Sequence, residues 1–170
     1  ADLFVRRYRG EADTHYLHPA LIPILEPTKG VLIFQEQVLR VATEIAGLSW
    51  AQAGHIRRGM SKMQPEEMSQ LQAVFIEGCQ RPDGPGLSES QAEQLWKQVA
   101  AFSGYGFNQG HATAYADVSY LSAYMKVHHP AAFFWARLRS YGGYHHPAVY
   151  MAEAIRMGIE VRPPHVNYSE

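Results

Sequence analysis

The pattern of apolar positions indicates helices along most of the chain. The clearest signal lies between Gly30 and Gly47, where apolar side chains recur every three or four residues. That spacing places them on one face of an α-helix, and a glycine commonly ends such a helix. We therefore predict a helix over this range, with an inward face formed by Phe34, Val38, Val41 and Ile45.

Three further helix starts carry local signals. Ser49 and Ser88 are each followed three residues later by a glutamine, a spacing typical of a capping box. Pro65, followed by two glutamates, is typical of the first turn of a helix. We expect the apolar positions after these starts to face the interior: Ala53, Ile56 and Met60, then Met68, Leu71 and Phe75, then Ala92, Leu95, Val99 and Phe102.

The remaining segments complete an all-α fold of about seven helices in a single domain. Prolines in residues 1–29 permit short turns or a brief helix, so this range is an entry segment. The helical body spans 30–158, and 159–170 forms a short extended tail whose first residues, 159–162, look strand-like. Within the body, a fifth helix is expected to end near Lys126, a sixth to begin at Pro130, and a seventh to run from Pro147 to Gly158.

Composition narrows the class of protein. Hydrophobic residues make up 46% of the 170-residue chain, yet no apolar run reaches the length of a membrane span. The single Cys79 cannot form an internal disulfide, which favours a reducing compartment, and we expect the cytoplasm. The net charge of -1 means that any polyanion must be bound by a local patch. The chain opens without an initiator Met, which suggests a piece of a longer protein.

One such patch lies on the second predicted helix. His55, Arg58 and Lys62 share one helical face, with Arg57 beside them and no acidic residue between. Paired guanidinium groups offer planar donors that match phosphate oxygens, so this cationic ridge is a candidate phosphate or nucleic-acid site. A basic face that simply meets solvent remains the plainer explanation.

A second candidate is the glycine-rich corner 104–111 between two apolar helices. Its glycine spacing and its preceding helix exclude a dinucleotide-binding fingerprint. It does lead into a helix whose free N-terminal amides favour an anion, with Asn108, Gln109 and His111 as hydrogen-bonding groups. Alternatively, it is only a turn in which Tyr105 and Phe107 fill the core.

Residues for metal binding or covalent catalysis are not apparent. The four aspartates are too far apart in sequence to suggest a shared cradle, and Glu36 stands alone at a helix start. The adjacent histidines at 128–129 and 145–146 diverge in direction and suit loops better than a metal site. We therefore assign this chain no catalytic residue and no metal ligand.

Several motifs follow one another along the chain: Gly30–Val38, Ile56–Lys62, Pro65–Met68, Gly104–His111 with Ala114–Ala116, and Tyr124–Lys126 with His129–Ala131. In order and spacing, these motifs closely resemble the fingers region of the bacterial replicative DNA polymerase III alpha subunit. Similar flanks lie at 16–19 and 157–167, so the resemblance covers nearly the whole chain.

The resemblance implies a helical element that closes over an incoming dNTP, while the palm, earlier in the polypeptide, carries the Mg²⁺-binding aspartates. Its partners would be dNTP, primer-template DNA and the rest of the polymerase chain, and the fragment alone should be inactive and self-associate through its exposed apolar face. The matching nucleotide-binding positions are Arg57, Arg58, Lys62, Tyr105, Phe107, Asn108, Gln109 and His111.

The chain departs from the family pattern at two places. Ser61–Gln64 stands where the family usually has Gly-Lys-Lys-Lys, and Gln109–Gly110 where it usually has Lys-Ser. The missing lysines weaken phosphate attraction and would also suit the error-prone branch, so both branches stay open. The alternative function is a non-catalytic helical module that uses Arg6, Arg7, Arg9 and the ridge to bind a DNA backbone, or that binds a protein.

Overall fold

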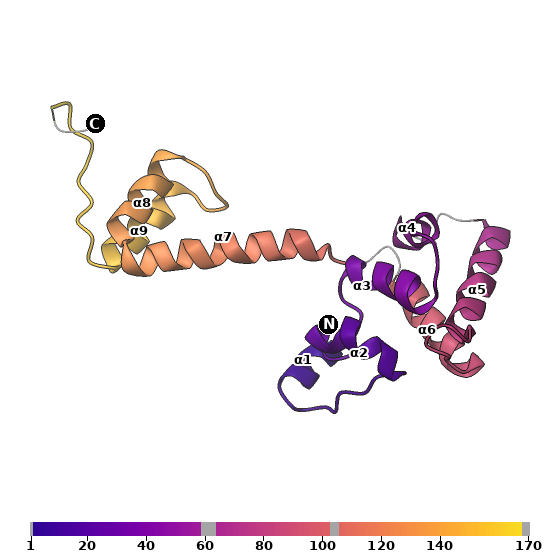
Figure 1. The fold of residues 1–170 in the computed structure, drawn as a ribbon. Helices are drawn as coiled ribbons and strands as arrows, with labels where there is room; N and C mark the ends of the chain where they lie inside the picture. The colour runs from indigo at the N-terminus through magenta and orange to yellow at the C-terminus, as the bar shows by residue number, and fades with distance from the viewer. Residues whose placement is uncertain (1, 59–63, 103–105, 168–170) are drawn as a thin grey trace. The chain divides into compact units, whose positions relative to one another are not determined.

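The computed structural model describes residues 2–58, 64–102 and 106–167, and their regular structure is helical (Figure 1). The all-α prediction is therefore confirmed. The predicted helices correspond to α3–α9, and two more, α1 and α2, lie in the entry segment. The bounds are α1 Asp2–Tyr8, α2 Ile22–Leu25, α3 Gln35–Arg40, α4 Trp50–Arg58, α5 Pro65–Gln80, α6 Glu89–Phe102, α7 Gln109–His128, α8 Pro130–Arg139 and α9 Pro147–Arg156.

Both predicted capping boxes are present. The Ser49 amide donates to the side chain of Gln52 at 2.9 Å, and the Gln52 amide donates back to the Ser49 hydroxyl at 3.3 Å. Ser88 and Gln91 repeat the exchange at 3.0 and 3.3 Å. These reciprocal bonds satisfy amides that have no partner within a helix, so they fix where α4 and α6 begin.

The helix predicted over 30–47 is shorter and less regular than expected. Gln37 explains the late start: its side-chain oxygen accepts the amides of Ile33 and Phe34 at 2.9 and 3.0 Å, which holds residues before Gln35 out of the helix. The helix then continues through a π-helical turn, Val41–Ile45, and ends at Gly47 with φ of +65°. A left-handed glycine at this point agrees with the sequence-based stop.

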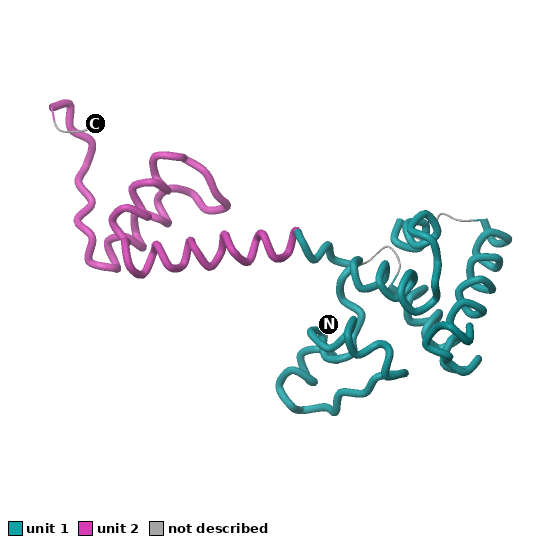
Figure 2. Tube along the Cα trace, in the orientation of Figure 1, with its two compact units in different colours: residues 1–110 teal, residues 111–170 magenta. Residues whose placement is uncertain are grey.

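The chain folds into two compact units, residues 1–110 and 111–170 (Figure 2). The first has a continuous apolar core, in which α5 packs on α6 and α3 packs on α4. Within this core, the ring centroids of Phe75 and Trp96 lie 5.2 Å apart. Gly78 lets α5 approach the backbone of Ala46, because an added Cβ would collide with that carbonyl. The structure divides the chain into these two units. That the chain is a single domain stays a prediction.

The second unit is smaller and buries much less. It consists of α8 and α9, which pack together, and the greater part of α7. Among its described residues, only Phe134 and Ala154 are buried apolar side chains. Lys126 of α7 donates to Glu153 of α9 at 2.6 Å, and Arg156 also binds that carboxylate at 2.6 Å. The Glu153 carboxylate therefore binds two cations, one from α7 and one from α9.

The tail after α9 is extended but forms no strand over its described residues, 159–167, which corrects the strand-like reading of 159–162. A strand needs a neighbouring strand to satisfy its backbone, and the one bridge in the described chain joins Phe34 to Phe107 instead. No described helix combines the length and apolarity that a membrane crossing requires.

Candidate functional site

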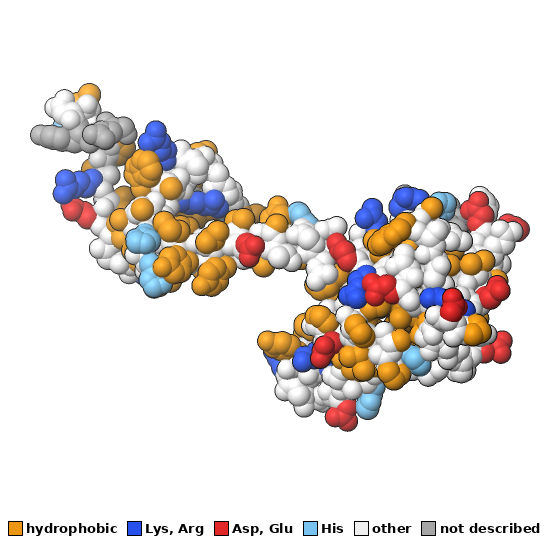
Figure 3. Space-filling model, viewed as in Figure 1, with side chains coloured by type: hydrophobic (Ala, Val, Ile, Leu, Met, Phe, Trp, Pro, Cys, Tyr) orange, Lys and Arg blue, Asp and Glu red, His pale blue; other side chains and the backbone are white. Residues whose placement is uncertain are grey.

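The described members of the cationic ridge, His55, Arg57 and Arg58, lie on the last turn of α4. Ala53 and Ile56, each 0% exposed, anchor this helix in the core. Arg57 and Arg58 follow directly and are both exposed. Cations at a helix C-terminus also interact favourably with its negative end, so the fold itself tolerates this charge. Figure 3 shows Lys and Arg side chains near α4.

Neither Arg57 nor Arg58 forms an ion pair with an acidic side chain of the described residues. Ion pairs there engage other cations: Arg40, Arg81, Lys126, Arg156 and Arg162. The Arg58 guanidinium lies back along α4, with Nη1 3.6 Å from the point where a Gly54 Cβ would sit. Arg57 and Arg58 are consecutive in sequence on the helix, and a guanidinium group without a carboxylate partner can bind a phosphate group from solvent.

His55 differs from the arginines in its surroundings. It lines a hollow of about 360 Å³ between α4 and α5, together with Leu71, Val74 and the acidic Glu67. The surface around Arg57 and Arg58 is therefore cationic, whereas His55 has both apolar and acidic neighbours. Lys62, the fourth predicted member, lies outside the described residues.

The glycine-rich corner is attached to the start of α3. The Gln35 amide donates to the Phe107 carbonyl at 2.8 Å, and the Phe107 amide donates to the Ile33 carbonyl at 3.2 Å. The Phe107 side chain is 71% exposed, so the idea that it fills the core is wrong. A backbone bridge holds Phe107 in place and leaves its ring in solvent. Tyr105 lies outside the described residues.

At the start of α7, a carboxylate of the protein itself binds a backbone amide. Glu36 Oε2 accepts the backbone N–H of Gln109 at 2.8 Å, across 73 residues of sequence. Asn108 precedes the helix, and its Oδ1 lies 3.5 Å from the position of a Gly110 Cβ. Sequence reasoning placed Glu36 only at the start of its own helix. Its position between two glutamines, in a motif already singled out, was the available signal for a wider role.

The structure brings only part of the predicted site into one unit. Arg57, Arg58 and corner residues 107–109 belong to residues 1–110, and both groups are attached to α3, one through helix packing and the other through backbone bonds. His111 belongs to the second unit, where its ring lies 4.5 Å from that of Tyr115. The resemblance implies that the arginines, Lys62 and His111 bind the same nucleotide, and this stays a prediction.

Other basic and histidine residues have structural roles. Arg7 donates to the carbonyls of Asp13 and Lys29, both at 2.9 Å, and so ties α1 to later residues of the entry segment. His146 Nδ1 accepts the Ala148 amide at 3.2 Å and so caps α9. Arg6 and Arg9 are exposed. Of the three N-terminal arginines that the alternative DNA-backbone site combines with the ridge, Arg7 therefore already serves the fold.

The described residues contain no group of three His, Cys, Asp or Glu side chains that could hold a metal ion. Cys79 is buried, and desolvation raises the pKa of its thiol to about 11 despite nearby Arg81. A thiol with so high a pKa is a poor nucleophile, so Cys79 acts as a small apolar core residue.

Comparison with known proteins identifies relatives of this chain. Residues 1–83 match the bacterial DNA polymerase III alpha subunit finger domain. DNA polymerase III subunit alpha of Rickettsia conorii is 42% identical over 91% of the chain, and that of Campylobacter jejuni is 37% identical over 98%. The Escherichia coli subunit is 36% identical over 98% of the chain.

The chain spans only 13–15% of the length of these relatives. The similarity nevertheless extends over both units, since it covers nearly all of this chain. The motifs, the helical fold and these identities agree, and the chain belongs to the bacterial DNA polymerase III alpha subunit family, where it corresponds to the fingers region.

Proposed function

We propose that this chain is the fingers part of a DNA-directed DNA polymerase and that Arg57 and Arg58 bind the triphosphate of the incoming dNTP. The observation that carries the proposal is the pair itself: two exposed arginines, consecutive in sequence and without carboxylate partners in the described chain, at the end of a helix anchored by Ala53 and Ile56. The planar donors of a guanidinium group match phosphate oxygens.

The remaining predicted groups would complete that site. Phe107, Asn108 and Gln109 would contact the nucleotide from the corner, and Lys62, Tyr105 and His111 would join them when the fingers close. Primer-template DNA and the rest of the polymerase chain would be the other partners, in the cytoplasm. Mg²⁺ would be held by the palm of the intact enzyme, because the described residues offer no carboxylate cluster for it.

Nucleotide binding tests the proposal directly. We expect the Arg57→Ala/Arg58→Ala chain to bind dATP at least about tenfold more weakly, since each charge-assisted hydrogen bond contributes about 1.5–3 kcal/mol. Isothermal titration calorimetry measures the affinity, and circular dichroism should show unchanged helical content. The matched control is Arg6→Ala/Arg9→Ala, which removes the same charge from exposed positions on or beside α1.

The outcome also separates the two functions. A dNTP site predicts that the α4 variant alone loses dATP binding and that dAMP binds much more weakly than dATP. A DNA-backbone module predicts that both double variants lose affinity for any polyanion, with steep salt dependence. Equal dATP affinity for the α4 variant and the unaltered chain would rule out the proposed site.

The isolated chain should incorporate no nucleotide into primed DNA with magnesium or manganese. Phosphoryl transfer by two metal ions needs carboxylates that its described residues do not bring together. A primer-extension assay on a preparation free of host polymerase checks this expectation. Robust incorporation would contradict it.

A further inference from the structure

Glu36 occupies a junction between two of the motifs in the first unit. It lies on the first turn of α3, and its carboxylate binds the backbone N–H of Gln109 at 2.8 Å. Backbone bonds from Gln35 to Phe107 and from Phe107 to Ile33 lie beside this contact, at 2.8 and 3.2 Å. Three hydrogen bonds thus join the corner to the start of α3.

The corner also lies unusually close to α3. A Cβ added to Gly106 would lie 3.0 Å from Cγ of Gln35 and 2.9 Å from Cζ of Phe102. Such approaches are tighter than ordinary van der Waals contact, so only glycine allows the corner to reach this position without displacing its neighbours. The hydrogen bonds between the corner and the start of α3 are therefore accompanied by close packing at Gly106.

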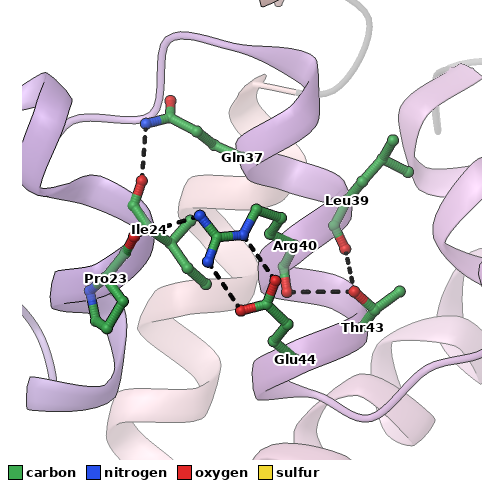
Figure 4. A network of polar contacts seen from close by, with 7 residues as sticks. All are labelled: Pro23, Ile24, Gln37, Leu39, Arg40, Thr43 and Glu44. Carbon is green, nitrogen blue, oxygen red and sulfur yellow. Dashed lines mark hydrogen bonds and ion pairs between the residues drawn. The ribbon is translucent and has the colours of Figure 1, made fainter.

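The residue after Glu36 makes its support rigid. Gln37 is 5% exposed, and besides holding the amides of Ile33 and Phe34 it donates to the Thr28 hydroxyl at 2.6 Å. It also donates to the Ile24 carbonyl at 3.2 Å, as Figure 4 shows. Because these bonds fix the first turn of α3, the Glu36 carboxylate has a defined position from which to accept the Gln109 N–H.

Electrostatics gives the contact a second consequence. The N-terminus of a helix carries partial positive charge and attracts anions, and a carboxylate bonded to its amide satisfies that attraction. An incoming phosphate at this point would meet a negative charge already in place. The start of α7 is therefore a poor phosphate site, and the phosphate would favour Arg57 and Arg58.

We propose that Glu36 is a positioning residue: it holds Asn108 and Gln109 against α3 so that they can contact the nucleotide, and it does not touch the nucleotide itself. The proposal rests on the proposed dNTP-binding function. It extends that function by assigning a role to the acidic residue of the Gln35–Glu36–Gln37 sequence, which holds the corner from α3 rather than from the corner's own helix.

Hydrogen exchange of the Gln109 amide tests the contact without any nucleotide. In the 170-residue chain, Glu36→Ala should speed exchange of this amide about tenfold or more, because a charge-assisted hydrogen bond is lost. Glu36→Gln keeps a carbonyl acceptor and should restore most of the protection. The matched control is Glu66→Ala, an exposed glutamate in the first turn of α5. Unchanged exchange in Glu36→Ala would overturn the contact.

Affinity for dATP then tests the positioning role. Glu36→Ala should weaken dATP binding about three- to tenfold, Glu36→Gln should recover most of it, and Glu66→Ala should leave it unchanged. Higher affinity in Glu36→Ala would mean that the carboxylate competes with phosphate, and unchanged affinity would mean that corner position does not matter; either result overturns the role.

The two proposals fail in different ways. If Arg57→Ala/Arg58→Ala leaves dATP affinity unchanged, the proposed function fails, while Gln109 exchange still decides whether Glu36 holds the corner. If the arginine variant loses affinity and Glu36→Ala does not, only the positioning role fails.

Discussion

The two units differ in how much of their own apolar surface they bury. The first contains a continuous core extending from Leu21 to Val99 in sequence, with Phe75, Ile56 and Leu95 fully enclosed. In the second, Trp135 is 60% exposed, Val149 51% and Ile155 61%. Helix α7 has no buried residue in its described span, although apolar side chains line it, as Figure 3 illustrates.

This difference indicates that the units rely on different sources of stability. Buried apolar area supplies most of the favourable free energy of folding, so the first unit can hold its site residues rigidly. The second unit buries few apolar side chains, and the Lys126–Glu153–Arg156 contacts join α7 to α9. Several large apolar side chains left exposed on one helix are typical of a surface that contacts another part of a larger protein.

The largest effect should come from the first core. Phe75→Ala removes a fully buried ring from its contact with Trp96, and we expect the free energy of unfolding to fall by about 3–5 kcal/mol. Urea unfolding followed by tryptophan fluorescence measures the change. The neighbouring Val74 is 42% exposed, so Val74→Ala is the control and should cost less than about 1 kcal/mol. Equal losses would contradict the difference in burial between these two positions of the first unit.

The exposed apolar side chains of the second unit should cause self-association. Val118 and Leu121, 62% and 59% exposed, lie three residues apart on α7. Replacing both by lysine should shift an associating sample toward monomer, with an apparent dissociation constant about tenfold higher or more, since charge opposes burial of the patch. Sedimentation equilibrium measures this shift. Val166→Lys, at a tail position that is 94% exposed, is the control. A strictly monomeric unaltered chain at high concentration would refute the expectation.

The smallest effect concerns Glu153. Hydrogen bonds from Arg156 and then Lys126 lower the pKa of this carboxyl from 4.5 to about 2. Because the folded-state pKa is depressed, the stabilisation is present above about pH 4.5 and is lost as pH falls toward 2. The stability difference between the unaltered chain and Glu153→Gln should therefore shrink over this window. Urea midpoints at pH 6, 4 and 2.5 measure it, with Glu160→Gln as the exposed control. A difference that is independent of pH would contradict the assignment.

Local signals in the sequence were enough to predict the helices. The Ser49–Gln52 and Ser88–Gln91 pairs determined two starts, and prolines determined three more, at Pro65, Pro130 and Pro147. These predictions succeed because a cap depends on residues within one turn of each other. The helix predicted over 30–47 began late because Gln37 bonds the preceding backbone, an arrangement that the apolar period does not encode.

For the candidate site, the sequence alone identified Arg57 and Arg58 as a charged pair on a helix, and the family motifs placed them in a polymerase fingers region. Only the tertiary structure decided that the corner is tied to α3, that Phe107 faces solvent and that Glu36 supplies the anion at the start of α7. Helix formation is governed by neighbours three or four residues apart, whereas Glu36 and Gln109 meet across 73 residues, after the chain has folded around its core.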